Sequence, residues 1–224
     1  MRSSLQISES LQNILSVLPA GIELVAVSKF QPVESIEAAY QAGQRMFGES
    51  RVQELLEKIP RLPSDIQWHF IGHLQTNKVK SIIGKTSLIE SVDSERLLSL
   101  IDGESRKKEV STRVLMQVHV AREETKFGFS PEELMEFFEG GKHESLTNTE
   151  ICGLMAMATN TDDLNTVRND FAKVAGIFRE LLQKYGDNLK NFRILSMGMS
   201  GDWPIAVEEG SNLIRVGSAI FGSR

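Results

Sequence analysis

The stretch Ile22-Glu23-Leu24-Val25-Ala26-Val27-Ser28-Lys29-Phe30-Gln31-Pro32 sets the structural pattern of the chain. Its first half, Ile22 to Val27, predicts a strand, because short apolar runs bounded by turn residues are typical of buried strands. Ser28 to Gln31 predict a loop, and Pro32 suits the first turn of a helix. Apolar residues at helical spacing follow as far as Gly43. This stretch therefore predicts one strand–loop–helix unit.

The same unit repeats along the rest of the chain. Further apolar runs that predict strands occupy residues 45–48, 66–71, 87–92, 113–120, 151–155, 192–195 and 212–216. Strands that alternate with helices indicate a parallel sheet, and eight is the number that closes a barrel. We therefore predict a single-domain (β/α)₈ TIM barrel over residues 1–224, with an extra N-terminal helix over 5–17. An open, doubly wound sheet is the alternative.

Polar residues mark where several of the intervening helices should begin. Asp93 is a plausible N-cap for the helix after the fourth predicted strand. Ser130-Pro131-Glu132-Glu133 combines a cap, a first-turn proline and early acids. Asp162 is expected to open a long helix whose apolar face begins at Leu164.

Composition narrows the class of protein. The chain has 224 residues, of which 41% are hydrophobic and 25% charged, which is ordinary for a globular domain. Its 25 basic and 30 acidic side chains give a net charge of −5, so we expect no nucleic-acid partner. No apolar run approaches the roughly 18 residues of a membrane span, and the first residues lack a secretory h-region. The single cysteine, Cys152, excludes an internal disulfide, and we expect a cytoplasmic location.

Lys29 is the most informative candidate for chemistry. In a barrel of this kind, the loops after the carboxyl ends of the strands form the active face, and Lys29 follows the first predicted strand directly. We expect the barrel mouth to bury this side chain partly, which disfavours the ammonium form and leaves the free amine able to attack an aldehyde. A lysine that simply extends to water at a strand end is the alternative.

Small residues follow the seventh and eighth predicted strands. The two segments are Ser196-Met197-Gly198-Met199-Ser200-Gly201-Asp202 and Arg215-Val216-Gly217-Ser218. Barrel enzymes often bind phosphate at this place, with backbone N–H groups and a helix N-terminus. Glycine lets the backbone approach an anion closely, and Ser200 and Ser218 can donate from their hydroxyls. The segments therefore predict either an anion site or two tight structural turns.

Other candidates have both a functional and a structural interpretation. Arg215 ends the last predicted strand and can either face a pyridine nitrogen or pair with an acid such as Glu49. Cys152 lies in an apolar run and is expected to be a buried small side chain. His69 and His73 lie across a strand end without the pattern of a metal site, so we expect no metal.

Several motifs together resemble the pyridoxal phosphate homeostasis protein family. They cover the chain from about residue 22 to the C-terminus, in order and in spacing. The motifs are Ala26-Val27-Ser28-Lys29, Phe47-Gly48-Glu49-Ser50-Arg51-Val52-Gln53-Glu54, Trp68-His69-Phe70-Ile71-Gly72-His73-Leu74-Gln75-Thr76-Asn77-Lys78, Lys126-Phe127-Gly128-Phe129, Gly153-Leu154-Met155, Ser196-Met197-Gly198-Met199-Ser200-Gly201-Asp202 and Arg215-Val216-Gly217-Ser218-Ala219-Ile220-Phe221-Gly222.

The resemblance implies a site for pyridoxal 5′-phosphate. It implies a Schiff base on Lys29, a phosphate site at Ser200, Gly201, Gly217 and Ser218, and Arg215 opposite the pyridine nitrogen. The whole set that we expect at the cofactor is Lys29, Ser50, His73, Ser196, Met197, Ser200, Gly201, Arg215, Gly217 and Ser218. Lys126 matches a second family lysine, although a surface charge is the alternative. The family usually has Asn where this chain has Ser50, so a contact made by that amide is in doubt.

The resemblance also implies a carrier of vitamin B6 cofactor with no catalysed reaction of its own. A two-base racemase needs an acid or base on each face of the substrate carbon. In alanine racemases a tyrosine from a second domain supplies the opposite base, and this chain stops soon after its eighth predicted strand. We expect its two tyrosines, Tyr40 and Tyr185, on outer helices away from the mouth.

Some alternatives remain at this stage. The chain can be a cofactor-dependent racemase or lyase, or an aldolase that uses Lys29 directly. An interaction module without a reactive lysine is the third class. If the chain is a carrier, we expect a monomer that supplies the cofactor to apo forms of cofactor-dependent enzymes.

Overall fold

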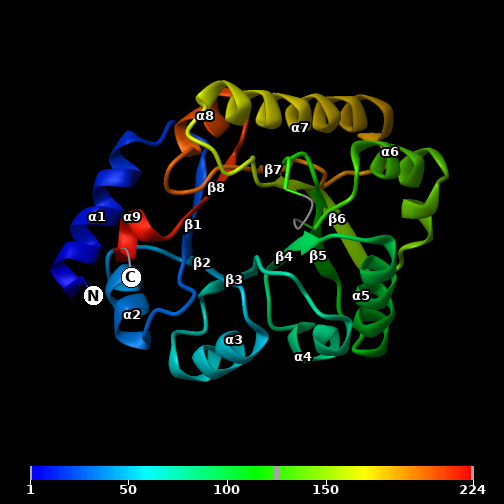
Figure 1. Ribbon diagram of the computed structural model, residues 1–224. Coiled ribbons are helices and arrows are strands. Elements are labelled where there is room, and N and C mark those ends of the chain that lie inside the picture. Colours follow the sequence, from blue (N-terminus) through cyan, green and yellow to red (C-terminus); the bar gives the residue numbers. More distant parts are fainter. Residues whose placement is uncertain (1, 124–126, 223–224) are drawn as a thin grey trace.

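The computed structural model describes residues 2–123 and 127–222, and its strands form a closed parallel barrel (Figure 1). The strands are β1 (Glu23–Val27), β2 (Met46–Glu49), β3 (Gln67–Phe70), β4 (Leu88–Val92), β5 (Thr112–Val118), β6 (Thr149–Ala156), β7 (Ile194–Ser196) and β8 (Leu213–Val216). Each strand pairs with the next, and β8 pairs back with β1, where Ala26 lies opposite Val216. The predicted barrel is confirmed, and the open sheet is wrong.

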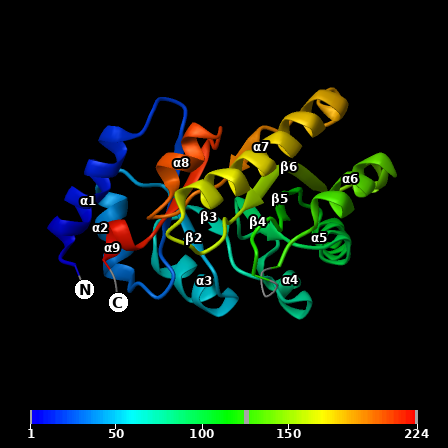
Figure 2. The ribbon, with the colours of Figure 1, turned by 45° about the horizontal axis from the view of Figure 1, so that its top comes forward.

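Helices follow the strands and surround the barrel, as Figures 1 and 2 show. In the described ranges they are α1 (Ser4–Val17), α2 (Val33–Gln41), α3 (Val52–Lys58), α4 (Val79–Ile82), α5 (Glu95–Lys107), α6 (Pro131–Glu139), α7 (Leu164–Tyr185), α8 (Trp203–Glu208) and α9 (Ser218–Phe221). Short 3₁₀ turns occupy Ile59–Arg61, Thr76–Lys78 and Lys142–Ser145. None of the helices in these ranges has the length and apolar character that a membrane crossing requires.

Helix starts follow the predicted caps in one case and differ in two. At α6, Ser130 and Glu133 form a capping box with Pro131 in the first turn, as the sequence predicts. At α5, Ser94 is the N-cap rather than Asp93. The carboxylate of Asp93 instead lies 2.7 Å from His73 Nδ1, so a tertiary partner takes the group that was expected to cap.

Asp163, one residue later than expected, caps α7. Leu164 directly follows this cap and is 61% exposed, so its assignment to the apolar face is wrong. Of the remaining residues of that face, Val167, Phe171, Val174 and Leu181 are buried and Phe178 is partly buried.

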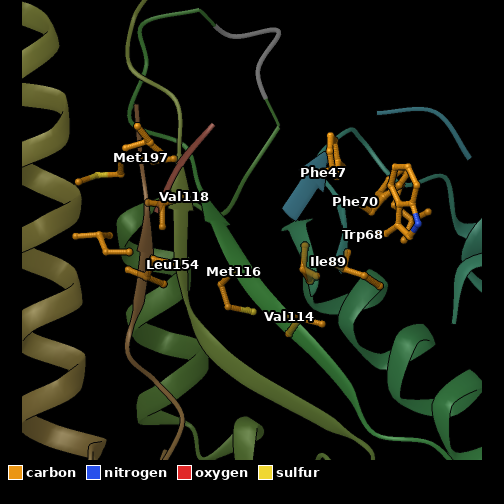
Figure 3. Close-up of a cluster of buried hydrophobic side chains, with 14 of the residues drawn as sticks. Phe47, Trp68, Phe70, Ile89, Val114, Met116, Val118, Leu154 and Met197 are labelled. Carbon is orange, nitrogen blue, oxygen red and sulfur yellow. The ribbon is translucent and has the colours of Figure 1, made fainter. Parts of the chain in front are cut away.

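Buried apolar side chains form two clusters, on the two sides of the barrel wall. The larger cluster mixes strand residues with helix residues such as Ile36 and Phe171, so it fills the layer between barrel and helices. Figure 3 shows part of it, including Phe47, Trp68 and Met197. The buried members of the smaller cluster all come from strands: Val25, Leu88, Leu115, Cys152, Met155 and Leu213. They fill the barrel interior, because successive strand residues point to opposite faces.

The N-terminal helix α1 packs beside α2 and α9 and brings the chain ends close together (Figure 1). Arg2 Nη1 donates to the carbonyl oxygens of Ala219 and Ile220, at 2.5 and 2.9 Å. The predicted extra helix therefore anchors α9, whose first turn stands at the mouth of the barrel.

Candidate functional site

The β1–β8 pairing places the Lys29 loop beside the glycine that follows β8. Ala26 lies opposite Val216, so Val27 comes next to Gly217. A Cβ on Gly217 would lie 3.2 Å from the Val27 carbonyl oxygen, which is a close approach that favours glycine. Lys29 follows two residues later and its side chain is exposed. The predicted partial burial of Lys29 is therefore wrong.

Ser200 joins the two small-residue segments. Its Oγ accepts hydrogen bonds from the backbone N–H groups of Gly217, at 3.2 Å, and Ala219, at 3.4 Å. Gly201 is exposed, and an added Cβ would meet no atom within 4 Å, so its backbone is open to solvent. Ser218 is also exposed, at the first position of α9. The structure thus brings hydroxyl and backbone donors from both segments to one place at the mouth.

Arg215 lies one layer below this mouth, inside the barrel. Its Nη2 donates to the Ala156 carbonyl oxygen at 2.9 Å, and its Nη1 donates to Ser196 Oγ. Ser196 Oγ in turn donates to Glu90 Oε2 at 2.6 Å, and Arg215 Nη1 lies 3.6 Å from the same oxygen. Arg215 therefore pairs with Glu90 on β4, and not with Glu49.

His69 completes this interior network, with its Nδ1 2.7 Å from Glu90 Oε1. Burial alone would raise the pKa of Glu90, but the contacts with His69, Arg215 and Ser196 outweigh burial and lower it. Burial lowers the pKa of Arg215, while Glu90 and Asp202 oppose that shift. The network therefore keeps a carboxylate and a guanidinium paired beneath the mouth.

Ser50 and His73 lie at another part of the mouth, after β2 and β3. They line one hollow together with the cationic side chains of Arg51 and Lys78. The His73 ring stacks on Phe127 with 3.8 Å between ring centroids, and its Nδ1 lies 2.7 Å from the Asp93 carboxylate.

The structure does not bring Met197 to the mouth. Its side chain is fully buried in the layer between barrel and helices (Figure 3). Its N–H donates to Ser211 Oγ and to the Leu213 carbonyl oxygen, and its own carbonyl oxygen accepts from Ser211 Oγ. All the polar groups of this residue are engaged away from the candidate site.

Three charged residues that no sequence motif predicted as a group lie under the Lys29 loop. Lys58 Nζ is 2.8 Å from both Glu49 Oε1 and Glu54 Oε1. Burial raises the pKa of Glu49, while hydrogen bonds from Lys58 and Ser28 oppose the shift. The spacing of Glu54 and Lys58, four residues apart on one helix, was the available signal for part of this cluster.

Other candidates stand apart from the mouth. Cys152 is fully buried, and burial raises the pKa of its thiol, as expected for an inert side chain. Tyr40 lies on α2, where its hydroxyl donates to Asp65, and Tyr185 lies on α7. Within residues 2–123 and 127–222, no His, Cys, Asp and Glu side chains gather in a group able to hold a metal. Lys126 lies outside the described residues.

A profile of the family described as alanine racemase, N-terminal domain, matches residues 4–224. The alanine racemase of E. faecalis has the same fold, with a TM-score of 0.74 at 21% identity over 99% of this chain and 59% of that one. Fold and site together define a barrel of the alanine racemase N-terminal class.

Closer relatives narrow this class. The curated protein of Aquifex aeolicus (strain VF5) named pyridoxal phosphate homeostasis protein is 41% identical over 203 residues, which cover 90% of this chain and 87% of that protein. The structure of PipY from Synechococcus elongatus PCC7942 with PLP bound has a TM-score of 0.87 at 37% identity, covering 96% of this chain and all of that one. The chain belongs to the pyridoxal phosphate homeostasis protein family, which confirms the resemblance stated from the sequence.

Proposed function

We propose that this chain binds pyridoxal 5′-phosphate through a covalent bond to Lys29 and serves as a carrier or buffer of that cofactor. This proposal depends on the β1–β8 pairing, which makes the loop with the exposed Lys29 side chain a neighbour of the segment that contains Gly217 and Ser218. An aldehyde that also bears a phosphate matches both halves of this arrangement. The PLP-bound structure of the relative PipY supports the same cofactor here.

The residues at the mouth fit the chemical groups of this cofactor. The hydroxyls of Ser200 and Ser218, the open backbone at Gly201, and the backbone at Gly217, whose N–H donates to Ser200 Oγ, would hold the phosphate, because hydroxyl and N–H donors suit an anion. Arg215, held by Ser196, would face the pyridine nitrogen. Ser50 and His73 would complete the opposite side of the mouth. When bound, the cofactor supplies a reactive aldehyde and an electron-withdrawing ring.

The same residues favour a carrier over an enzyme. A guanidinium at Arg215 would keep a facing pyridine nitrogen unprotonated, and that weakens the ring as an electron sink. A racemase also needs a second acid or base across from Lys29. Tyr40 and Tyr185 both lie on outer helices in the described structure. We therefore assign no catalysed reaction to the chain and expect little racemisation of amino acids.

The proposed carrier role also concerns the assembly, the location and the partners of the chain. We propose that the 224 residues act as one cofactor-binding domain, as a monomer in the cytoplasm, and that apo forms of cofactor-dependent enzymes receive the cofactor. Mixing the loaded chain with such an apo-enzyme should restore its activity faster than the same concentration of free cofactor. Sedimentation equilibrium measures the molar mass in solution and so tests whether the chain is a monomer.

The test of the function is an absorption spectrum before and after borohydride. The loaded protein should be yellow, the band should disappear on reduction, and the cofactor should then remain on the peptide that contains Lys29. Lys29→Ala should abolish the band. Lys85→Ala is the matched control, because Lys85 is also exposed but precedes β4 at the other end of the barrel. An undiminished, reducible band in Lys29→Ala would overturn the proposal.

A further inference from the structure

Lys29 occupies the second position of a tight turn with an unusual third residue. The Gln31 N–H donates to the Ser28 carbonyl oxygen at 3.0 Å, which closes a four-residue turn from Ser28 to Gln31. Phe30 has a φ of 63°, in the left-handed region. Turns with a positive φ at the third position usually take glycine or asparagine there, because a Cβ is disfavoured. A phenylalanine at this position needs support from outside the turn.

That support comes from the end of β2 and from α3. Lys58 Nζ donates to the Ser28 carbonyl oxygen at 2.9 Å, and the Ser28 hydroxyl donates to Glu49 Oε1 at 2.6 Å. On the other side of Lys29, the Phe30 N–H donates to Glu54 Oε1. The residues before and after Lys29 are thus both tied to one cluster, whereas the Lys29 side chain stays exposed.

The cluster is held together by its own charges. Lys58 is 6% exposed and Glu49 is fully buried, so both charges are costly to bury without a partner. Lys58 Nζ lies 2.8 Å from Oε1 of both Glu49 and Glu54, whereas Glu49 Oε2 has no hydrogen-bond partner among the described residues. The guanidinium of Arg51 also lies 4.4 Å from the centre of the Phe30 ring. Two of the hydrogen bonds of Lys58 go to acids, and the third goes to the turn.

We propose that Lys58, Glu49 and Glu54 form a positioning cluster for Lys29. The proposal rests on the proposed function, because it assigns the cluster a role in the condensation of the Lys29 amine with an aldehyde. In that condensation a C=N bond forms between Nζ and the aldehyde carbon, and one water molecule leaves. The cluster touches neither reacting atom. It fixes the main chain on both sides of Lys29, so the amine meets the aldehyde with little loss of conformational freedom.

The first test uses the cofactor-free protein. In the wild type, the Phe30 amide hydrogen should exchange slowly with solvent, because Glu54 accepts it. Glu54→Ala removes the acceptor and should speed this exchange by about tenfold or more, with slow exchange kept in the barrel strands. Glu54→Gln retains an acceptor oxygen and should restore much of the protection. This readout does not depend on cofactor binding.

The second test measures the rate at which added pyridoxal 5′-phosphate becomes bound to the protein, followed by absorbance after rapid mixing. Lys58→Met keeps the length of the side chain and removes the ammonium, and it should slow attachment by about tenfold. Lys184→Met is the matched control, because Lys184 also pairs with two glutamates, Glu139 and Glu180, but on the exposed side of α7. Leu181→Ala, on the buried side of α7, controls for lost stability alone.

The outcomes separate the two proposals. If the wild type binds no cofactor at Lys29, the proposed function fails, whatever the variants do. If the wild type binds but Lys58→Met and Glu54→Ala attach the cofactor at the wild-type rate, only the positioning cluster is refuted. The positioning cluster is also refuted if Lys58→Met slows cofactor attachment no more than Leu181→Ala does at the same loss of stability. If Lys58→Met does not fold, Glu54→Ala and Glu54→Gln carry both tests.

Discussion

Glu90 and Arg215 are the pair on which the interior beneath the mouth depends. Both side chains are almost fully buried, and Glu90 accepts from Ser196 while His69 lies against its other oxygen. An ion pair in such a place is weak support for stability while both partners are present. Loss of one partner is costly, because the other charge stays buried without compensation.

Glu90→Gln should therefore destabilise the fold by about 3 kcal/mol, because Arg215 loses its counter-charge in a buried position. The midpoint of urea unfolding measures this loss. Glu104→Gln is the control, since Glu104 pairs with the exposed Lys107 on α5 and exposed pairs contribute little. Equal midpoints for Glu90→Gln and the wild type would contradict the role given to the pair.

Helix starts show how a few side chains set the limits of an element. At α6, the Ser130 hydroxyl accepts from the Glu133 N–H at 3.1 Å, and the Glu133 carboxylate accepts from the Ser130 N–H at 2.8 Å. Two backbone N–H groups without helical partners are thereby satisfied. The helix has nine residues, so it depends on its cap more than a long helix does.

Ser130→Ala should lower the free energy of unfolding by about 1 kcal/mol, because it removes the acceptor for the Glu133 N–H. Ser130→Asp keeps an acceptor at the N-cap and should recover most of the loss. Chemical denaturation of the three proteins in parallel measures both effects. A Ser130→Asp variant as unstable as Ser130→Ala would show that the box has no capping role here.

The sequence predicts elements well where the signal is local and poorly where a partner comes from far along the chain. The capping box at Ser130 needs only four adjacent residues and was predicted. Asp93 was predicted as a cap but lies against His73, twenty residues earlier, and Ser94 caps instead. For Arg215 the sequence suggested an acid such as Glu49, whereas closure of the barrel brings Glu90 to it.

At the scale of the whole molecule, the count of strands was enough to predict the barrel, and the barrel brings the two halves of the candidate site together. Lys29 and Gly217 are separated by most of the chain, yet the β1–β8 pairing makes their loops neighbours. The burial of Lys58 under the same loop was not predictable, because it depends on how α3 packs against the end of β2.

The pH dependence of stability is also a property of the whole molecule, since several groups with shifted pKa values act together. Contacts lower the pKa of Glu90 and of Asp102 against the effect of burial, so both stabilise the fold above the ordinary carboxyl range and lose this effect in acid. Burial raises the pKa of Glu49, so this group opposes the trend as pH falls. These carboxyl groups change the stability in acid. Nearer to neutral pH, we expect a loss of stability from His143.

His143 lies among the rings of Phe137, Phe138 and Tyr185, with 5.1 Å between the centroids of its ring and that of Phe138. Neither ring nitrogen has a hydrogen-bond partner within the described residues. Burial lowers the pKa of His143, and the charge of the neighbouring Glu144 opposes this shift without reversing it. As pH falls below about 6.5, the unfolded chain therefore takes up a proton that the folded chain resists, and unfolding becomes easier.

His143→Phe should remove this part of the pH dependence, because phenylalanine fills the aromatic site without a titratable group. Thermal unfolding at pH 7.5 and pH 5.5 (conditions on either side of the ordinary histidine pKa of about 6.5) measures it. From pH 7.5 to pH 5.5, the Tm of the wild type should fall more than the Tm of the variant. Subtracting one fall from the other cancels the contribution of Glu49, because both proteins contain it. Tyr185→Phe keeps His143 in place and should retain the wild-type dependence. An identical fall in the wild type and in His143→Phe would show that the titrating group lies elsewhere.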